Sequence, residues 1–276
     1  MKNFVDTSWV FKNFNKEKLI IVDCRGDLLN LNYGKAEYEA GHIKGAVFMD
    51  IKKDLSSEQA EHGGRNPLPE VDKFKSKLEN LGIGNDTLVI AYDEQRIASA
   101  ARLCWMLRYI GHNNNFILNG GIKKWKSDGY PVEKEVPVIK KNKLDISICK
   151  DIIADIKKVK ENSHKNEACL IDSRTEVRYR GEVELIDPAA GHIPGAVNFY
   201  WKNYLRDDGT VKEIDELKEA FKNLMEFKEV IVYCGSGIDA AFNYMLLEEV
   251  GISPRLYVGS FSDWITYPEN KIIGGE

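Results

Sequence analysis

Short apolar segments alternate with longer amphipathic segments along the chain. Six runs of three to five apolar residues are typical of buried strands in a parallel sheet: 19–22, 88–92, 116–118, 168–171, 230–233 and 256–258. The segments 71–81, 97–110, 213–225 and 239–250 between them are predicted as helices, and Gly82, Gly111 and Gly251 follow three of these. Strands that alternate with helices predict an α/β fold.

Four sequence patterns occur twice, in the same order and at a nearly constant spacing. The pairs are 21–25 with 170–174, 41–47 with 191–197, 88–92 with 230–233, and 120–125 with 258–264. The first pair places Asp-x-Arg after an apolar run, and the second repeats Gly-His-Ile-x-Gly-Ala-Val. We therefore interpret the chain as a tandem duplication of one domain, each copy a mainly parallel sheet with helices on both faces.

The two copies are joined by a stretch without apolar periodicity. Residues 133–143 are rich in lysine and contain proline, as expected for a connection between domains. We expect a first domain at 1–136, a linker at 137–148 and a second domain at 149–276.

Length and charge limit the possible functions. A chain of 276 residues is long enough for two domains with their own cores. Lys and Arg number 39 against 43 Asp and Glu, a net charge of −4, so we expect no nucleic-acid partner. The sequence shows no uninterrupted apolar run of about 18 residues and no signal-peptide core at its N-terminus, so we expect a cytoplasmic protein without a membrane partner.

The cysteines and histidines give no metal signature. Five cysteines form no Cys-x-x-Cys pair, and no two of the five histidines have metal-ligand spacing. We interpret four cysteines as buried, unreactive side chains: Cys24, Cys104, Cys149 and Cys169.

The fifth cysteine has a different setting. Cys234 follows an apolar strand and opens the sequence Cys-Gly-Ser-Gly-Ile, after which a helix is predicted from Asp239. Two glycines allow the backbone to curl so that successive N–H groups face one anion. A thiolate at a helix N-terminus is stabilised, and the thiolate is the nucleophilic form. We predict that Cys234 is a catalytic nucleophile.

The first copy provides an internal comparison. Aligning Tyr92 with Tyr233 places Asp93 at the position of Cys234, followed by Glu-Gln-Arg at 94–96 instead of Gly-Ser-Gly. A carboxylate cannot accept a sulfur atom, and the glycines are missing. We predict that the first domain is catalytically silent.

These patterns together resemble the two-domain rhodanese-like sulfurtransferases, the thiosulfate and 3-mercaptopyruvate sulfurtransferase family. The resemblance covers nearly the whole chain and rests on Asp-x-Arg, the repeated Gly-His-Ile-x-Gly-Ala, residues 178–181, the loop 234–237 and residues 257–264. It implies that Cys234 takes a sulfane sulfur from a donor, forms a persulfide, and passes the sulfur to a thiol or cyanide. It implies no metal or organic cofactor, and a thioredoxin-like protein is one candidate acceptor.

The resemblance also implies a donor site. Arg178 matches the family arginine that binds the anionic end of the donor. The rest of the site comes from the active loop: Gly235, Ser236, Gly237, Ile238 and Asp239.

Several departures from the family leave the donor open between thiosulfate and 3-mercaptopyruvate. The Cys-Gly-Ser-Gly loop resembles mercaptopyruvate enzymes, whereas thiosulfate enzymes carry basic residues after the cysteine. The second arginine of mercaptopyruvate enzymes, about nine residues after the first, has no basic counterpart in 184–187. Lys52 stands where some of those enzymes have an aspartate, and Asp239 would repel an anionic donor.

Residues present in both copies are interpreted as structural. His42 and His192 are expected to hold turns, Trp125 and Trp264 to lie in the cores, and the Asp-x-Arg pairs at 23–25 and 172–174 to form buried networks. His62 and Arg65 have no counterpart in the second copy, and they lie in a Gly/Pro-rich loop that either reaches the space between the domains or is solvated.

Two other function classes were considered. A cysteine phosphatase needs an arginine six residues after the cysteine, where this chain has Ala240. A persulfide carrier or regulatory rhodanese-like binding module that does not turn over small donors remains an alternative.

Overall fold

The chain forms two compact units in this computed structural model, which describes residues 1–94, 97–165 and 168–275. The first unit contains Met1–Ser57, Leu68–Cys149 and Leu205–Val211; the second contains Glu58–Pro67, Lys150–Tyr204 and Lys212–Glu276. Each unit therefore includes a short segment from the other half of the sequence. The predicted boundaries at 1–136, 137–148 and 149–276 stay predictions.

The first unit is built around a five-stranded parallel sheet in the order β1-β6-β5-β2-β4. Its strands are β1 (Phe4–Val5), β2 (Leu19–Asp23), β4 (Val47–Phe48), β5 (Leu88–Tyr92) and β6 (Asn115–Leu118). Its helices are α1 (Thr7–Asn13), α2 (Tyr33–Ala40), α3 (Val71–Asn80), α4 (Ala98–Tyr109) and α5 (Gly121–Ser127). Strands β3 (His42–Ile43) and β7 (Val132–Glu133) form a separate two-stranded antiparallel sheet.

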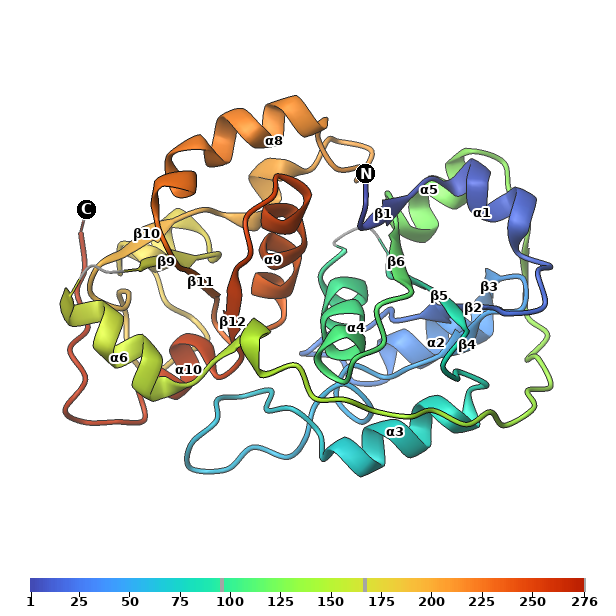
Figure 1. The fold of residues 1–276 in the computed structure, drawn as a ribbon, viewed down its shortest axis with the longest axis horizontal. Coiled ribbons are helices and arrows are strands. Elements are labelled where there is room, and N and C mark those ends of the chain that lie inside the picture. The colour runs from blue at the N-terminus through green and yellow to red at the C-terminus, as the bar shows by residue number, and fades with distance from the viewer. Residues whose placement is uncertain (95–96, 166–167, 276) are drawn as a thin grey trace. The chain divides into compact units, whose positions relative to one another are not determined.

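Helices cover both faces of this sheet. Val10 of α1 and Trp125 of α5 pack with Ile21, Ile90 and Tyr92 in one buried cluster. Helix α4 contacts β5 and β6, and Figure 1 shows it on the opposite side of the sheet from α1 and α5. Alternate side chains of a strand point to opposite faces, so a sheet covered twice needs strands that are apolar throughout. This explains the continuous apolar runs.

The second unit repeats this architecture around a parallel sheet in the order β10-β9-β11-β12-β8. Its strands are β8 (Ile153–Ala154), β9 (Cys169–Asp172), β10 (Ala196–Asn198), β11 (Val230–Tyr233) and β12 (Arg255–Tyr257). Its helices are α6 (Ile156–Lys165), α7 (Glu176–Tyr179), α8 (Ile214–Phe221), α9 (Asp239–Glu249) and α10 (Ser260–Trp264), with 3-10 turns η1 (Lys150–Ile152), η2 (Trp201–Tyr204) and η3 (Lys222–Glu226).

The core of the second unit matches that of the first. Val159 of α6 and Trp264 of α10 pack with Leu170, Ile231 and Tyr233. Helix α9 contacts β11 and β12, and it lies on the other side of the sheet from α6 and α10 (Figure 1). The predicted α/β fold, a mainly parallel sheet with helices repeated twice, is confirmed.

The predicted elements agree with the structure except at their edges. The strands predicted at 88–92 and 230–233 have those bounds, whereas 213–225 is a helix, α8, followed by the 3-10 turn η3. Gly82, Gly111 and Gly251 have positive φ angles of 80°, 90° and 91°, as helix-terminating glycines do. The two-residue strands β1, β3, β4, β7 and β8 and the three-residue strand β10 were not predicted, because so short a segment carries no periodic pattern.

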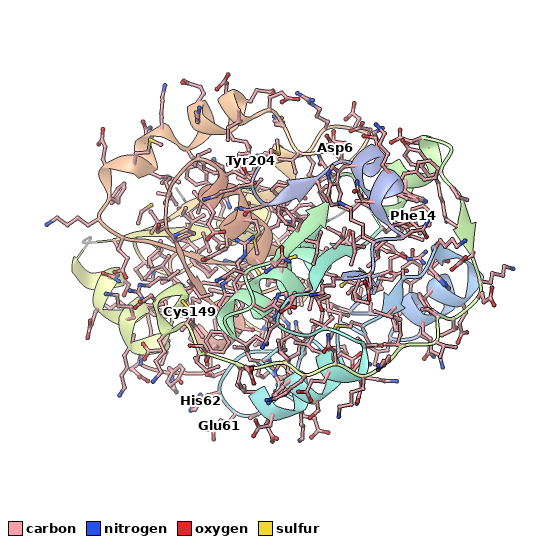
Figure 2. The ribbon with its side chains drawn as sticks, turned by 45° about the vertical axis from the view of Figure 1, so that its right-hand side comes forward. Asp6, Phe14, Glu61, His62, Cys149 and Tyr204 are labelled. Carbon is pink, nitrogen blue, oxygen red and sulfur yellow. The ribbon has the colours of Figure 1, made fainter. Side chains whose placement is uncertain are left out.

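One cysteine differs from its predicted burial. Cys24, Cys104 and Cys169 are buried, but Cys149 is only half-buried (Figure 2). It lies just before η1, and its amide N–H donates to the carbonyl of Tyr109 at 2.8 Å. The backbone therefore fixes Cys149 at an edge of the first unit, where its side chain stays partly accessible.

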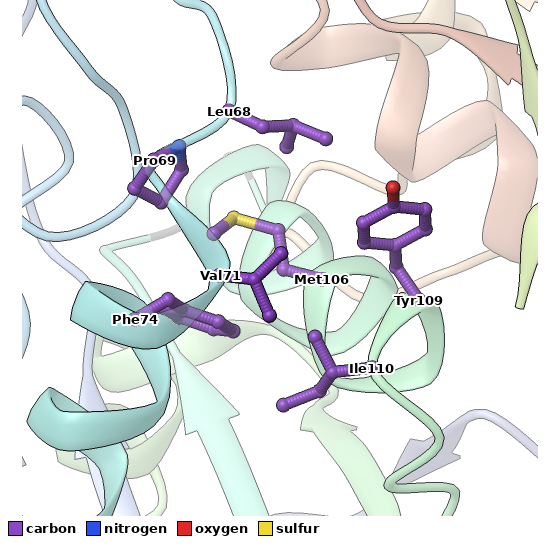
Figure 3. A pocket seen from close by; sticks show the side chains of 7 residues that line it. All are labelled: Leu68, Pro69, Val71, Phe74, Met106, Tyr109 and Ile110. Carbon is purple, nitrogen blue, oxygen red and sulfur yellow. The ribbon is translucent and has the colours of Figure 1, made fainter. Parts of the chain in front are cut away.

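A small apolar pocket lies in the first unit beside α3 and α4 (Figure 3). Its lining includes Phe74 of α3 and Met106 and Ile110 of α4. The space measures about 10 Å³, which is barely the size of one water molecule. It is a packing gap and cannot hold a substrate. Among the residues that the structure describes, no helix is long and apolar enough to cross a membrane.

Candidate active site

The Cys234 loop connects β11 to α9 at the carboxyl edge of the second sheet. Cys234 is 1% exposed, and its Sγ accepts a hydrogen bond from the Gly237 N–H at 3.1 Å. Gly237 has a φ of 77°, and a β-carbon there would overlap the Val258 carbonyl. Only glycine fits this position, and it lets the backbone turn back so that its N–H faces the sulfur. Gly237 therefore supplies one backbone N–H to the thiol.

Ser260, the first residue of α10, holds the start of the loop. Its Oγ accepts the Cys234 N–H at 3.1 Å and donates to the Tyr257 carbonyl at 2.9 Å. The next two amides of α10, from Phe261 and Ser262, donate to the carbonyls of Cys234 and Gly235 at 3.0 and 2.9 Å. The backbone of Cys234 and Gly235 is thus hydrogen-bonded to α10.

Ser260 achieves this in an unusual backbone conformation. Its φ is 57°, one of two positive φ angles among the described non-glycine residues. Such a conformation costs of order 1 kcal/mol and persists where surrounding contacts require it. Residues 257–264 are a family landmark in the sequence, but their pattern does not indicate the role of this hydroxyl. The repeated Gly-x-x-x-x-Trp pattern gave no signal for it, since the first copy has Gly121 here.

Arg178, in α7, lies over the loop. Its Nε donates to Glu184 at 2.9 Å and its Nη2 donates to Asp187 at 2.8 Å. A β-carbon built on Gly235 would lie 3.4 and 3.5 Å from its two terminal nitrogens. The structure therefore brings Arg178 to the loop that carries Cys234.

A second guanidinium, that of Arg65, lies at the same place. Its Nη2 would be 3.0 Å from a β-carbon on Gly235, and it forms an ion pair with Asp187, the partner of Arg178. Burial lowers the pKa of Arg65, the nearby Cys234 thiolate raises it, and the positive charge of Arg178 lowers it again. The side chain of Arg65 is thus not fully solvated. The sequence alone left open whether its loop is solvated or reaches other parts of the protein.

Arg65 belongs to the segment Glu58–Pro67, which is held on the second unit by its backbone. The Gly63 N–H donates to Asp263 at 2.7 Å, and the Arg65 N–H donates to the Ser262 hydroxyl at 3.0 Å. Between them, Gly64 has a φ of 79° and approaches the Gly259 carbonyl so closely that no side chain would fit.

Two side chains of this segment, those of His62 and Asn66, also bond to the second unit. His62 is exposed (Figure 2). Its Nδ1 lies 2.7 Å from the Thr266 hydroxyl, and its ring stacks on Tyr267. Asn66 donates from Nδ2 to the Ser236 Oγ at 2.8 Å. These contacts hold His62 against Thr266 and Tyr267 and hold Asn66 against the active loop.

The remaining predicted site residues lie along the loop. Ser236 and Ile238 are buried, at 6% and 5% exposure. Asp239, the first residue of α9, is half-buried. Its carboxylate lies in the first turn of that helix, where the helix dipole favours a negative charge.

The Asp-x-Arg pairs form buried networks in both copies, as predicted. Arg174 pairs with Asp172 at 2.6 Å and donates to the Gly191 carbonyl at 2.7 Å. In the first copy, Arg25 pairs with Asp23 at 2.6 Å and donates to Gly41 at 2.8 Å. The networks connect the ends of β2 and β9 to the turns at Gly41 and Gly191.

The repeated histidines hold the same turns. His42 and His192 lie 2.7 Å, through Nδ1, from the carbonyls of Tyr38 and Tyr179, and each ring stacks on that tyrosine. The structural role predicted for both histidines is confirmed by these contacts.

In the first copy, the side chain of Asp93 accepts hydrogen bonds from the start of the following helix. Asp93 is 5% exposed, and its two carboxylate oxygens accept the N–H groups of Ile97 and Ser99 at 2.8 and 3.1 Å. It therefore caps the start of α4. Gln95 and Arg96, part of the predicted contrast with the Cys234 loop, lie outside the described residues.

The site contains no metal-binding cluster. Over residues 1–94, 97–165 and 168–275, no group of three His, Cys, Asp or Glu side chains could hold a metal ion.

Comparison with known proteins agrees with this geometry. The family model of the rhodanese-like domain matches twice, at residues 6–128 and 155–267. A probable 3-mercaptopyruvate sulfurtransferase of Pseudomonas aeruginosa is 34% identical over 264 residues, covering 94% of this chain and 93% of the relative. A thiosulfate sulfurtransferase of Rattus norvegicus is 30% identical over 288 residues, covering 99% and 95%.

A solved structure shows the same fold. The crystal structure of SseA from Escherichia coli, titled as a 3-mercaptopyruvate sulfotransferase, aligns with a TM-score of 0.81 at 32% identity. The match covers 94% of this chain and 98% of that one. The chain belongs to the family of two-domain rhodanese-like proteins and is a sulfurtransferase.

Proposed function

We propose that this protein transfers a sulfane sulfur from thiosulfate or 3-mercaptopyruvate to a thiol or cyanide acceptor through a persulfide on Cys234. The observation that carries the proposal is the Cys234 sulfur itself, buried, hydrogen-bonded by the Gly237 N–H, and placed before the N-terminus of α9. A sulfur in this setting is stabilised as an anion, both as the attacking thiolate and as the persulfide product.

The first half-reaction forms one S–S bond and breaks one bond of the donor. The Cys234 thiolate attacks the sulfane sulfur, and the electron pair of the broken bond leaves with sulfite or with the enolate of pyruvate. The enolate takes up the proton of the donor thiol and becomes pyruvate. Cys234 is left as a persulfide, and no external oxidant or reductant is needed.

The second half-reaction restores the enzyme. An acceptor thiolate or cyanide attacks the outer sulfur of the persulfide, and the bond electrons return to Cys234 as a thiolate. The products are a persulfide of the acceptor or thiocyanate. This is a ping-pong scheme, because the donor product leaves before the acceptor reacts.

The loop and Arg178 are proposed to bind the donor. A guanidinium can form a two-pronged contact with a carboxylate or sulfonate, which suits either donor. The backbone of Gly235, Gly237 and Ile238 would face the transferred sulfur. Ser236 already accepts a hydrogen bond from Asn66, which leaves its own O–H to donate to the bound donor.

Asp239 is proposed to affect the choice of donor. Its negative charge at the end of the loop opposes an anionic substrate, so it favours the donor with less charge near α9. The donor itself stays open between the two compounds.

The acceptor is proposed to be a small thiol, cyanide or a thioredoxin-like protein. We also propose that the protein works in a reducing compartment such as the cytoplasm. All five of its cysteines are free thiols, and a persulfide intermediate requires a reduced cysteine.

The deciding experiment is a side-by-side steady-state assay with thiosulfate and 3-mercaptopyruvate as donors and with cyanide and a dithiol as acceptors. Intact mass after donor alone should rise by about 32 Da, one sulfur atom, on Cys234. Turnover with neither donor would contradict the proposal. If the mass increase then came only from a persulfidated partner protein, the chain would act as a sulfur carrier.

A further inference from the structure

We propose that Arg65 supplies a second cation to the donor-binding site and that Asp187 is the residue that positions it. The inference rests on the proposed function and deepens it by naming a donor contact from the Glu58–Pro67 segment. The proposed donors are anions that give up their water shell when they bind beside the buried Cys234 sulfur, and removing an anion from water is costly unless cations compensate for it.

The two guanidiniums face the same point of the loop. From a β-carbon built on Gly235, the nearest atoms are Arg65 Nη2 at 3.0 Å and the terminal nitrogens of Arg178 at 3.4 and 3.5 Å. Both guanidiniums thus lie against the active loop at Gly235. An anionic group bound at this part of the loop would be within reach of both positive charges.

Asp187 explains how two like charges can lie so close together. Its carboxylate is 1% exposed and pairs with Nη2 of Arg178 through one oxygen and with Nη1 of Arg65 through the other. A buried carboxylate shared by two guanidiniums fixes both and reduces their mutual repulsion. Nη2 of Arg65 and both terminal nitrogens of Arg178 lie near Gly235 while the two side chains share this carboxylate.

The charge balance of the cluster requires Arg65. Around the loop, the carboxylates of Asp172, Glu184 and Asp187 are paired with the guanidiniums of Arg65, Arg174 and Arg178. Without Arg65, three carboxylates would face two guanidiniums, and an anionic donor would approach a net negative cluster. With Arg65 the three carboxylates are balanced by three guanidiniums, and the donor approaches a less negative site.

The backbone of the Arg65 segment is built to hold this position. The Arg65 N–H is anchored to Ser262, which is itself hydrogen-bonded to the active loop through its backbone N–H and the Gly235 carbonyl. On the other side, Asn66 is hydrogen-bonded to Ser236. The backbone at Arg65 is thus connected to the Cys234 loop directly through Asn66 and indirectly through Ser262, and its side chain is held by Asp187.

The test compares Arg65→Met with the control Arg180→Met. Arg180 lies two residues from Arg178 but pairs with Glu176 at the surface. With whichever donor the wild-type protein uses, Arg65→Met should raise the donor KM at least tenfold with a smaller change in kcat, and Arg65→Lys should recover part of this loss. Arg180→Met should leave both constants within twofold of wild type.

Direct binding gives a second measurement that does not depend on turnover. In a Cys234→Ser background, titration calorimetry with thiosulfate should show an affinity at least tenfold weaker after Arg65→Met. Asp187→Asn, which keeps both arginines but loosens them, should weaken thiosulfate binding less than Arg65→Met. The double variant Arg65→Met/Asp187→Asn contains no unpaired buried carboxylate at 187, and it provides the same comparison if Arg65→Met alone fails to fold.

The outcomes separate the two proposals. An active wild-type protein whose KM and thiosulfate affinity stay within twofold after Arg65→Met would overturn this inference and leave the sulfurtransferase function intact. An equal loss in Arg180→Met would also overturn it, since the effect would then be one of overall charge. A wild-type protein inactive with both donors would overturn the proposed function, and this inference with it.

Discussion

The loops at Cys234 and at Asp93 have the same position in two copies of one domain. They differ in the side chain that lies before the following helix and in the N–H groups that it accepts. At Cys234, a glycine N–H reaches the sulfur, and two guanidiniums lie against the loop at Gly235. At Asp93, the carboxylate itself takes two N–H groups of the following helix. The same fold therefore provides either a place for an external anion or a self-contained helix cap.

The hydrogen bonds that α5 and α10 make to the two loops also differ. Amides of α5 and α10 donate to the loop carbonyls in both copies, from Ile122 to Asp93 and from Phe261 to Cys234. Gly121 and Ser260 share a positive φ, near 60°, but only Ser260 has a hydroxyl to accept the N–H of the loop residue. The reactive copy keeps a strained serine where the other copy has an unstrained glycine.

The largest effect is expected from replacing the nucleophile. Cys234→Ser should abolish sulfur transfer with either donor, a loss of at least about a thousandfold, because a serine hydroxyl is not ionised near neutral pH and cannot hold a persulfide. Cys149→Ser, at a half-buried thiol in the other unit, is the matched control and should keep full activity. Full activity in Cys234→Ser would show that the mechanism is wrong.

Removing the family arginine is expected to weaken donor use strongly. Arg178→Ala deletes a charged hydrogen-bond donor, which is worth about 1.5–3 kcal/mol, or roughly 10- to 150-fold in kcat/KM. Steady-state kinetics with varied donor should place the loss mainly in KM. Unchanged donor kinetics would remove Arg178 from the site.

A smaller effect is expected from replacing Ser260, which bonds to the active loop where the first copy has Gly121. Ser260→Ala removes the acceptor of the Cys234 N–H and should lower kcat/KM about five- to tenfold, the value of about one hydrogen bond. The rate of persulfide formation, followed by rapid mixing with donor, should fall with it. If that rate is unchanged, the serine acts on stability alone, and the comparison with Gly121 loses its functional meaning.

The smallest effect on activity is expected in the silent copy. Asp93→Ala leaves the Ile97 and Ser99 N–H groups without their carboxylate and should lower the stability of the first unit by about 1–3 kcal/mol. Sulfur transfer at a temperature where the protein is folded should stay unchanged. Thermal unfolding of variant and wild type, with activity measured on the same samples, tests both parts, and a large loss of activity would mean that the first copy takes part in the chemistry.

Much of the fold could be predicted because its determinants are local. The apolar runs 88–92 and 230–233 became strands with those bounds, and glycines such as Gly111 end helices with positive φ. The short strands β1, β4 and β8 could not be found, since two residues are paired by their neighbours and carry no period of their own. Cys149 was expected to be buried and is not, because burial depends on the final packing and not on a short apolar context.

The sequence by itself determined the duplication, the α/β fold of each copy, and the loop in which Cys234 stands and Asp93 replaces it. Each of these depends on residues within a few positions of one another, where periodicity and glycine conformation are decisive. Only the tertiary structure decided that Arg65 reaches this loop, that Asp187 joins it to Arg178, and that Asn66 meets Ser236 from 170 residues away. Such contacts are stabilised by packing and charge pairing between distant segments, and these interactions exist only when the chain is folded.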